Sequence, residues 1–406
     1  MQCLWIFGKE KGKLTKNYKK TLIACYLGFI TQAILANFAP LLFLRFHSEF
    51  GISIGQLALI STVFFLTQLV TDVFCAKFVD RIGYRKSIII SEITSGLGLI
   101  GLAVLPRILT NSFVGILLSV VIYAVGSGLI EVLCSPIVEA CPFDHKEAVM
   151  SLLHSFYCWG CVAVILLSTL FFAVFGIDHW RILACLWAVV PFLNIYNFAT
   201  CPIEHLVEDG KGLSIGRLFK IPLFWLAIVL MVSSGASELA MSQWASAFVE
   251  SALGLSKTVG DLAGPCMFAI MMGICRVIYG KYGSRIDLTK FMMGSGILCL
   301  ISYLLASMTR SPITGLVGCV ICGFSVGIMW PGTLSISSKQ LPLGGTAMFA
   351  LLAMAGDLGG ALGPSAVGWF TQMSGDNLRM GMRFGCVFPV IIIIGLWILN
   401  RNAERQ

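Results

Sequence analysis

Ionisable side chains stand inside several long apolar stretches of this chain, and they are its clearest candidates for chemistry. Such a group costs several kcal/mol in lipid, so it is usually kept to hold a proton, an ion or a partner. Glu131 lies between Gly128 and Pro136 in the middle of one stretch, where a carboxyl group can carry a proton at neutral pH. Glu238 is the second proton candidate, and the alternative for each is a structural carboxylate bonded to a neighbouring helix. The remaining candidates are Asp72, Glu92, Glu139, Arg276 and Asp357.

The elements that must position these groups are membrane helices. Hydrophobic residues make up 57% of the 406 residues, charged residues make up 12%, and the mean hydropathy is +0.90. A soluble domain carries about 25% charged residues. A chain with half that share cannot cover a water-facing surface, so the solvent of this chain is lipid. No basic domain stands outside the apolar stretches, which argues against nucleic-acid binding.

Twelve stretches are long and apolar enough to cross a bilayer, which requires about 20 mainly apolar residues. Lys and Arg gather by about three to one in the connections on the N-terminal side, which places both termini and the long polar connection 201–220 in the cytoplasm. The start of the chain reads as a lysine-rich cytoplasmic arm rather than a cleavable signal peptide. The predicted spans are 20–44, 54–79, 88–106, 112–140, 148–176, 180–200, 221–249, 259–283, 288–308, 313–338, 345–371 and 380–400.

The cysteines predict neither a redox centre nor a metal site. Two C-x-x-C spacings occur, Cys158 to Cys161 and Cys319 to Cys322, and both lie in the middle of apolar stretches. Redox or zinc chemistry needs a polar, accessible pocket, whereas a cysteine in lipid serves as a small apolar side chain. We therefore expect no metal and no cofactor. No P-loop sequence is present, which argues against a pump driven by ATP.

The chain contains an internal repeat. TDVFCAKFVDRIGYRKSIII at 71–90 matches CRVIYGKYGSRIDLTKFMMG at 275–294 at a constant offset, which aligns Lys77 with Lys281 and Arg81 with Arg285. We predict two six-helix bundles, 1–200 and 221–406, joined by a cytoplasmic linker, 201–220. Parallel repeats of this kind are typical of transporters that hold their substrate near the bilayer midplane between the halves.

The loop after the second span resembles the signature of the major facilitator superfamily, G-x-x-x-D-R-x-G-R-R/K. The matching positions are Ala76, Asp80, Arg81, Gly83, Tyr84 and Arg85, with Ala76 in place of a glycine and Tyr84 in place of an arginine. The resemblance covers the whole chain and implies an all-α membrane protein with twelve transmembrane helices in two pseudo-symmetric bundles.

The resemblance also implies a role for this loop as a cytoplasmic gate. In the family the loop clamps the cytoplasmic ends of helices two and eleven when the carrier faces outward. We expect Asp80 to pair with Arg81 or Arg85, or to lie at the positive N-terminal end of a neighbouring helix. A plain topology marker is the alternative. The expected gate residues are Asp72, Ala76, Asp80, Arg81, Gly83, Arg85, Arg276, Arg285 and Asp357.

Within the superfamily, the chain resembles the fucose-permease-like group of sugar:proton symporters. GLIEVLCSPIVEACP in span four, MSLLHSFYCWG in span five and GIMWPGTLSIS in span ten carry this likeness. Where the fucose carrier of that group has an acid in helix one, this chain has Asn37 and Pro40, so the substrate is not carried over.

A sugar site needs amide or hydroxyl partners and aromatic faces, and several such residues lie on segments that the family turns inward. For the aromatic residues, core packing or lipid contact is an equal alternative, and His154 could instead relay the proton. The expected substrate-binding residues are Gln32, Asn37, His154, Tyr157, Trp159, Gln243, Trp244 and Trp330.

We therefore predict a secondary transporter of the plasma membrane, a monomer and not an enzyme, that takes up a small polar solute such as a sugar with protons by alternating access. The alternative is a proton-driven efflux carrier for drugs or metabolites. Span five lacks the proline common in the helix five of such exporters, which favours uptake. Intramembrane aspartyl proteolysis is disfavoured because the settings of Asp72 and Asp357 match neither of its motifs.

Overall fold

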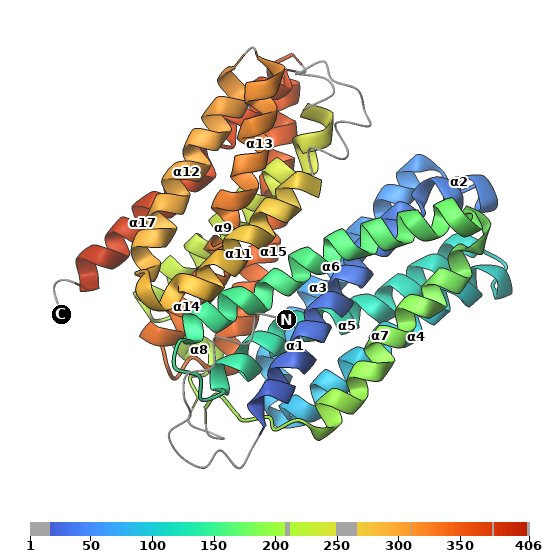
Figure 1. Cartoon of the computed structure of the whole chain (residues 1–406), viewed down its shortest axis with the longest axis horizontal. Coiled ribbons are helices and arrows are strands. Elements are labelled where there is room, and N and C mark those ends of the chain that lie inside the picture. Colours follow the sequence, from blue (N-terminus) through green and yellow to red (C-terminus); the bar gives the residue numbers. More distant parts are fainter. Residues whose placement is uncertain (1–16, 208–211, 249–265, 310, 376, 404–406) are drawn as a thin grey trace. The chain divides into compact units, whose positions relative to one another are not determined.

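The computed structural model describes residues 17–207, 212–248, 266–309, 311–375 and 377–403, and every regular element in them is a helix (Figure 1). The chain divides into two compact units, and each is described by itself. The first unit comprises Met1–Asp144, Trp159–Gly212 and Gly345–Ala350. The second unit comprises His145–Cys158, Leu213–Gly344 and Leu351–Gln406.

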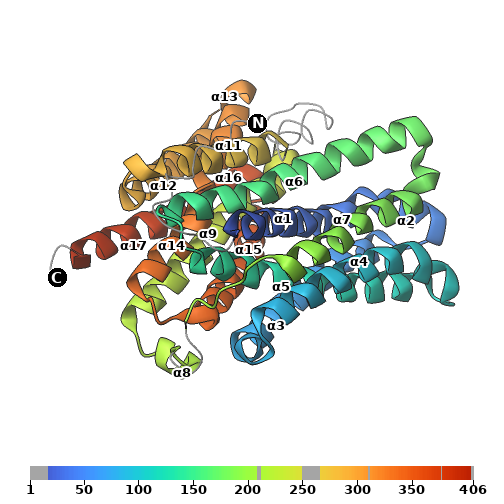
Figure 2. The ribbon, with the colours of Figure 1, turned by 60° about the horizontal axis from the view of Figure 1, so that its bottom comes forward.

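The first unit is a bundle centred on α4 and α5. Helix α4 packs against α5 and α7, and α5 also packs against α1 and α3; α4 and α7 lie side by side in both ribbon views (Figures 1 and 2). Buried aromatic side chains such as Phe38, Tyr123 and Trp180 fill its core. Its elements are α1 (Tyr18–Leu41), α2 (Phe43–Phe50), α3 (Ile54–Ile82), α4 (Tyr84–Ile108), α5 (Ser112–Ala140), the second half of α6 (Lys146–Phe175), η2 (Ile177–His179) and α7 (Trp180–Thr200).

The second unit is built in the same way around α9, α12 and α13, with the first half of α6 added. Helices α9 and α15 cross almost backbone to backbone. A Cβ on Gly359 would clash with the carbonyl group of Val232, so a glycine at this position allows the close approach. The remaining elements are α8 (Ile215–Leu218), α9 (Pro222–Ala247), α11 (Met267–Tyr282), η5 (Gly283–Arg285), α12 (Leu288–Met308), α13 (Pro312–Val326), α14 (Met329–Gln340), α15 (Gly345–Met373), α16 (Leu378–Phe384) and α17 (Val387–Ala403).

The helices confirm a multi-pass membrane protein. Among the described residues, 11 helical segments are long and apolar enough to cross a membrane, and each coincides with a predicted span. The other predicted span, 259–283, lies partly outside the described residues, and its described part forms α11. Most of the lysine-rich arm, residues 1–16, also lies outside them.

The two units do not follow chain order throughout. The segment His145–Cys158, which includes the start of α6, belongs to the second unit, and the later residues of α6 belong to the first. The start of α15, Gly345–Ala350, also belongs to the first unit. The domain boundaries 1–200, 201–220 and 221–406 remain a prediction.

Candidate functional site

A carboxyl group with two amide donors forms the centre of a polar cluster in the first unit. Glu131 on α5 accepts a hydrogen bond of 2.9 Å at Oε2 from Gln32 Nε2 on α1. The same oxygen accepts a second bond from Gln68 Nε2 on α3. Ser127, about one turn before Glu131, donates to Gln68 Oε1 at 3.1 Å. Three helices therefore converge on one carboxyl group.

The groups of this cluster can hold a proton and accept one further hydrogen bond. An amide N–H can donate to an ionised carboxylate and equally to the carbonyl oxygen of a protonated one, so both forms of Glu131 keep these two bonds. Gln32 is 6% exposed, and its Oε1 accepts no hydrogen bond from the described residues. Because buried amide oxygens are normally satisfied, this oxygen can accept from a hydroxyl group of a solute.

Gln68 is a member of the cluster that the sequence analysis missed. It lies in the run STVFFLTQLVTDVF of α3, four residues before Asp72. The signal was present, since an amide side chain in lipid needs a partner. Gln32, in contrast, was selected as an amide on a segment that the family turns inward. What the sequence did not reveal is that the partner of both amides is the same carboxyl group.

The two other expected site residues of the first unit have other surroundings. Asn37 Nδ2 donates to the Ala33 carbonyl within α1 at 2.9 Å and to Cys161 Sγ on α6 at 3.2 Å. Trp159 is half-buried on α6. In this structure both nitrogen bonds of Asn37 are made to the protein itself.

Arg276 on α11 is the centre of a second buried cluster, in the second unit. It is 3% exposed, and its Nη2 lies 3.6 Å from Glu238 Oε2 on α9. Its Nη1 donates to the His154 carbonyl and to Cys158 Sγ on α6, both at 3.0 Å. The sequence analysis placed Arg276 in the gate and Glu238 at the proton site, and the structure brings the two together.

Arg276 also satisfies a backbone carbonyl group at a break in a membrane helix. Helices α13 and α14 are separated at Gly327 and Ile328. The Gly327 carbonyl would normally accept from the N–H of residue 331, but that residue is Pro331, which has none. Arg276 Nε donates to this carbonyl at 2.8 Å. Non-helical backbone is tolerated at membrane depth where the protein satisfies its polar groups, and here the guanidinium does so.

The other expected substrate residues of the second unit are not gathered at Arg276. Trp244 Nε1 on α9 donates to the Pro364 carbonyl at 2.9 Å. Trp330 on α14 packs over Gly356 of α15, where a Cβ would clash with the indole. Gln243 is exposed on α9, and Tyr157 is half-buried on α6. The two tryptophans thus pack against α15, as the structural alternative for the aromatic residues expected.

The loop between α3 and α4 contacts the start of α15 within the first unit. Thr346 donates to Asp80 Oδ1 at 2.7 Å. Because the Thr346 hydroxyl is used in that bond, the Tyr84 hydroxyl is the donor in its own contact with Thr346 Oγ1. The Tyr84 ring also lies 4.8 Å from the His205 ring, between centroids. Asp80 is thus bonded to span eleven rather than to Arg81 or Arg85.

Arg85, on the first turn of α4, contacts the end of α7. Its Nη1 donates to the carbonyl groups of Phe198 and Ala199, and its Nη2 donates to that of Cys201 at 2.8 Å. These carbonyl groups lie at the end of α7, where the last turn of a helix lacks intrahelical donors and a cation is favoured. Gly83 separates α3 from α4 with a φ of +92°, which a side chain would strain.

The remaining expected gate residues are spread over two helices and a 3-10 turn. Asp72 and Ala76 are buried on α3, and Asp357 is half-buried on α15. Arg81 is exposed at the end of α3, and Arg285 is exposed in η5. Of the expected gate, Asp80 is bonded to the start of α15 and Arg85 to the end of α7, while Arg276 belongs to the cluster with Glu238.

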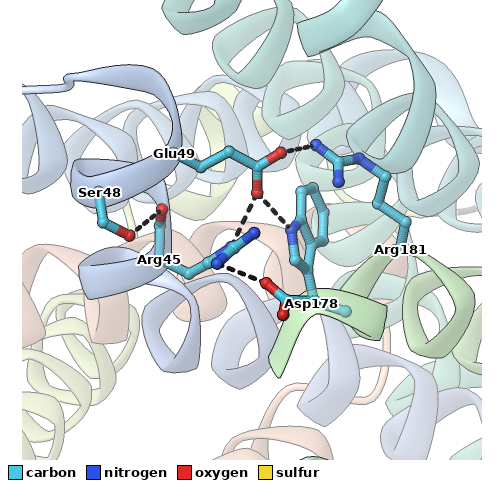
Figure 3. A network of polar contacts seen from close by, with 6 residues as sticks. Arg45, Ser48, Glu49, Asp178 and Arg181 are labelled. Carbon is cyan, nitrogen blue, oxygen red and sulfur yellow. Dashed lines mark hydrogen bonds and ion pairs between the residues drawn. The ribbon is translucent and has the colours of Figure 1, made fainter. Parts of the chain in front are cut away.

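A charged cluster that the sequence analysis did not predict joins α2 to the start of α7 (Figure 3). Glu49 accepts from Arg45 at 2.9 Å, from Trp180 Nε1 at 3.1 Å and from Arg181. Arg45 also pairs with Asp178 at 2.7 Å. Burial alone would raise the pKa of Glu49, but the hydrogen bonds from Arg181, Trp180 and Arg45 outweigh it and lower that pKa below its ordinary value.

Comparison with known proteins agrees with this architecture. A family profile described as Major Facilitator Superfamily matches residues 24–364. A curated relative from Yersinia pestis, an uncharacterized MFS-type transporter, is 22% identical over 197 residues, which are 47% of this chain and 49% of that protein. The chain thus matches about half the length of this curated relative.

Solved structures with the same fold cover nearly the whole chain. The Escherichia coli fucose:proton symporter FucP is 15% identical with a TM-score of 0.79, over 93% of this chain and 98% of that one. The proton:xylose symporter XylE is 13% identical with a TM-score of 0.78, over 93% and 95%. The human organic anion transporter MFSD10 is 15% identical with a TM-score of 0.72, over 93% and 99%. At these identities the likeness shows the fold alone.

Proposed function

The chain belongs to the major facilitator superfamily, and from that premise we propose that it is a secondary transporter that couples uptake of a small, sugar-like solute to protons. The polar cluster of the first unit carries the proposal. Glu131 would bind the proton, and Gln32, whose Oε1 lacks a donor in the described chain, would bind a solute hydroxyl. FucP and XylE, which share the fold, are named as proton symporters of sugars.

The proposal includes the surroundings of the protein. The distribution of Lys and Arg favours an orientation with both termini in the cytoplasm, and the membrane we propose is the plasma membrane. The loop with Asp80 would then lie at the cytoplasmic face and regulate the alternation of access. A proton-driven exporter of drugs or metabolites is the alternative, and the direction of solute movement in vesicles distinguishes the two.

A ligand screen followed by a transport assay tests this function. Thermal shifts of the purified protein with sugars, polyols, nucleosides and organic acids identify a solute. Its uptake into proteoliposomes is then measured with and without an inward proton gradient. We expect the gradient to drive accumulation by the wild type. Solute moving only outward, or uptake indifferent to the gradient, would contradict the proposal.

The variant Glu131→Gln tests the assignment of the proton site. Because glutamine keeps an acceptor for Gln32 and Gln68 but cannot titrate, we expect gradient-driven uptake to fall by about tenfold or more, in the range of a lost acid–base group. Asp144→Asn is the matched control, because Asp144 is exposed between α5 and α6, and it should keep wild-type uptake. Uptake by Glu131→Gln at the wild-type rate would exclude Glu131 as the coupling acid.

A further inference from the structure

The proposed function leaves two fully buried acids of the first unit unused, Asp72 on α3 and Glu92 on α4, and the contacts of Glu92 show what it can bind. Glu92 on α4 is 0% exposed. Its Oε1 accepts a hydrogen bond of 2.8 Å from Asn194 Nδ2 on α7. Its Oε2 lies 3.4 Å from Thr31 Oγ1 on α1. Both partners are neutral, and no charged side chain of the described chain contacts this carboxyl group.

The helices packed against α4 bring no cation to Glu92. These helices are α1, α3, α5 and α7. On the side of α1 and α5, the groups near Glu92 are a glycine and two thiols. A Cβ on Gly28 of α1 would lie 3.7 Å from Glu92 Oε1 and 3.1 Å from the Cys134 thiol of α5, and the Cys25 thiol of α1 contacts Cys134. The acids on these helices are Asp72 and Asp80 on α3 and Glu131 and Glu139 on α5, and none of them contacts Glu92.

The hydrogen bonds of the Asn194 amide fix its orientation. That orientation determines whether each oxygen of Glu92 acts as a donor or as an acceptor. Asn194 Nδ2 also donates to the Ala24 carbonyl at 2.9 Å, and its Oδ1 accepts from Asn197 at 3.1 Å. Since a backbone carbonyl can only accept, the nitrogen of Asn194 must face both Ala24 and Glu92. Glu92 Oε1 is therefore an acceptor, and its Oε2 faces a hydroxyl group that can donate or accept.

A protonated carboxyl group satisfies this geometry at lower cost than a carboxylate. An ionised group buried without a cation loses its hydration and receives only two neutral bonds, one of them long, in return. A neutral group keeps the bond from Asn194 at its carbonyl oxygen and donates its O–H to Thr31 Oγ1. Thr31 is followed by Gln32, which donates to Glu131, so adjacent residues of α1 contact both acids.

We propose that Glu92 is a second proton-binding site of the first unit, holding a proton while it is buried between α1, α4 and α7. Loss of this proton would loosen α1 from α4, and the adjacent Thr31 and Gln32 would link this change to Glu131. A role in coupling rests on the proposed proton-driven transport, whereas proton binding by Glu92 does not.

Infrared spectroscopy of the reconstituted full-length protein tests the proton site without any solute. A protonated carboxyl group absorbs apart from a carboxylate, and its band shifts in D₂O. We expect Glu92→Gln to lose one component of the protonated-carboxyl band at neutral pH, whereas Asp144→Asn, at an exposed acid, keeps it. Thr31→Val should shift that component without removing it. A component that persists unchanged in Glu92→Gln overturns the proposal.

Two further measurements separate a proton site from a packing role. The amide introduced by Glu92→Gln would imitate the neutral acid, with an acceptor for Asn194 and a donor for Thr31, so this variant should melt like the wild type while Glu92→Leu melts lower. A Glu92→Gln protein that melts as low as Glu92→Leu would show that the native group is charged and would also overturn the proposal. If the infrared band assigns a proton to Glu92, but gradient-driven uptake is lost in Glu131→Gln and kept in Glu92→Gln, then Glu92 binds a proton without taking part in coupling.

Discussion

Single side chains in this protein hold helix ends and corners that apolar packing cannot hold. Glu49 accepts from three donors and connects α2 with the start of α7, and Arg85 satisfies the carbonyl groups at the other end of α7. The partners of Glu49 are N–H donors, and the partners of Arg85 are carbonyl groups that lack a donor within the helix. Helix α7 is therefore anchored by charge at each end and by the apolar core between them.

The lowered pKa of Glu49 predicts a pH-dependent stability. A carboxyl group whose folded pKa lies below its unfolded value of about 4.3 stabilises the fold above that value, and this contribution is lost as pH falls through the folded pKa. Because hydrogen bonds to a charged group contribute about 1.5–3 kcal/mol, we expect Glu49→Gln to lower the free energy of unfolding by about 2 kcal/mol at pH 7. The difference should shrink below about pH 4.

Unfolding of the purified protein followed by tryptophan fluorescence at several pH values measures this difference. Asp178→Asn is the control, because the Asp178 side chain is 73% exposed and pairs only with Arg45 in the described chain, so it should change stability little. An equal loss for Glu49→Gln at acid and neutral pH would contradict the assignment.

At the scale of elements, the sequence predicted the helices well and their interruptions poorly. Length and apolar composition located every span that the structure describes, because a bilayer fixes both. The break between α13 and α14 was not predicted, since Pro331 alone permits either a kink or a break. Arg276, which donates to the Gly327 carbonyl at this break, lies 51 residues away in sequence. The hydrophobic periodicity of a sequence does not predict such a distant contact.

The same limit applies to the candidate site. The sequence selected Glu131, Glu238 and Arg276 individually, because an ionisable group is costly in lipid, and it selected Gln32 as an amide that can bind a sugar. It did not pair Gln32 with Glu131 or Arg276 with Glu238, because the pairing depends on which helix faces turn toward each other. These spans are apolar around most of their circumference, so the sequence contains little hydrophobic asymmetry from which to read those faces.

The broken helix predicts a coupling between Arg276 and Pro331. Removing one partner of a buried ion pair costs about 3–5 kcal/mol, so Arg276→Gln should destabilise the protein strongly. Part of that loss is the orphaned Gly327 carbonyl. Pro331→Ala supplies the missing N–H, so we expect Arg276→Gln to cost about 1 kcal/mol less in the Pro331→Ala background, which is the worth of one hydrogen bond.

A double-mutant cycle on unfolding midpoints measures this coupling. Pro364→Ala on α15 is the matched control, because Pro364 lies inside a helix and shares no hydrogen bond with Arg276 in the described chain. The Arg276 and Pro364 changes should add. Additive losses for Arg276 and Pro331 as well would mean that the guanidinium does not stabilise the break.

At the scale of the whole molecule, the repeated loop is used differently in its two copies. In the first copy, Tyr84 donates to Thr346, and Thr346 donates to Asp80, so the end of α3 is bonded to the start of α15. In the second copy, the acid Asp287 caps α12 by accepting from the Lys290 N–H at 2.8 Å. The copies share the spacing of their basic residues, but Asp80 aligns with Ser284 in the second copy, so the bond of an acid to a distant helix belongs to the first copy.

This contact predicts an effect on transport rate rather than on solute affinity. The Asp80–Thr346 bond involves none of the groups around Glu131, so Asp80→Asn and Thr346→Val should alter the maximal uptake rate several-fold, in the range of one charge-assisted hydrogen bond, and leave the KM for solute near that of the wild type. Because both variants break one chain of hydrogen bonds, the double variant should be no worse than the more affected single variant. Lys86→Gln, at an exposed neighbouring position, is the control. Initial uptake rates over a range of solute concentrations measure both quantities, and a change confined to KM would mean that this loop acts on the binding site and not on the alternation of access.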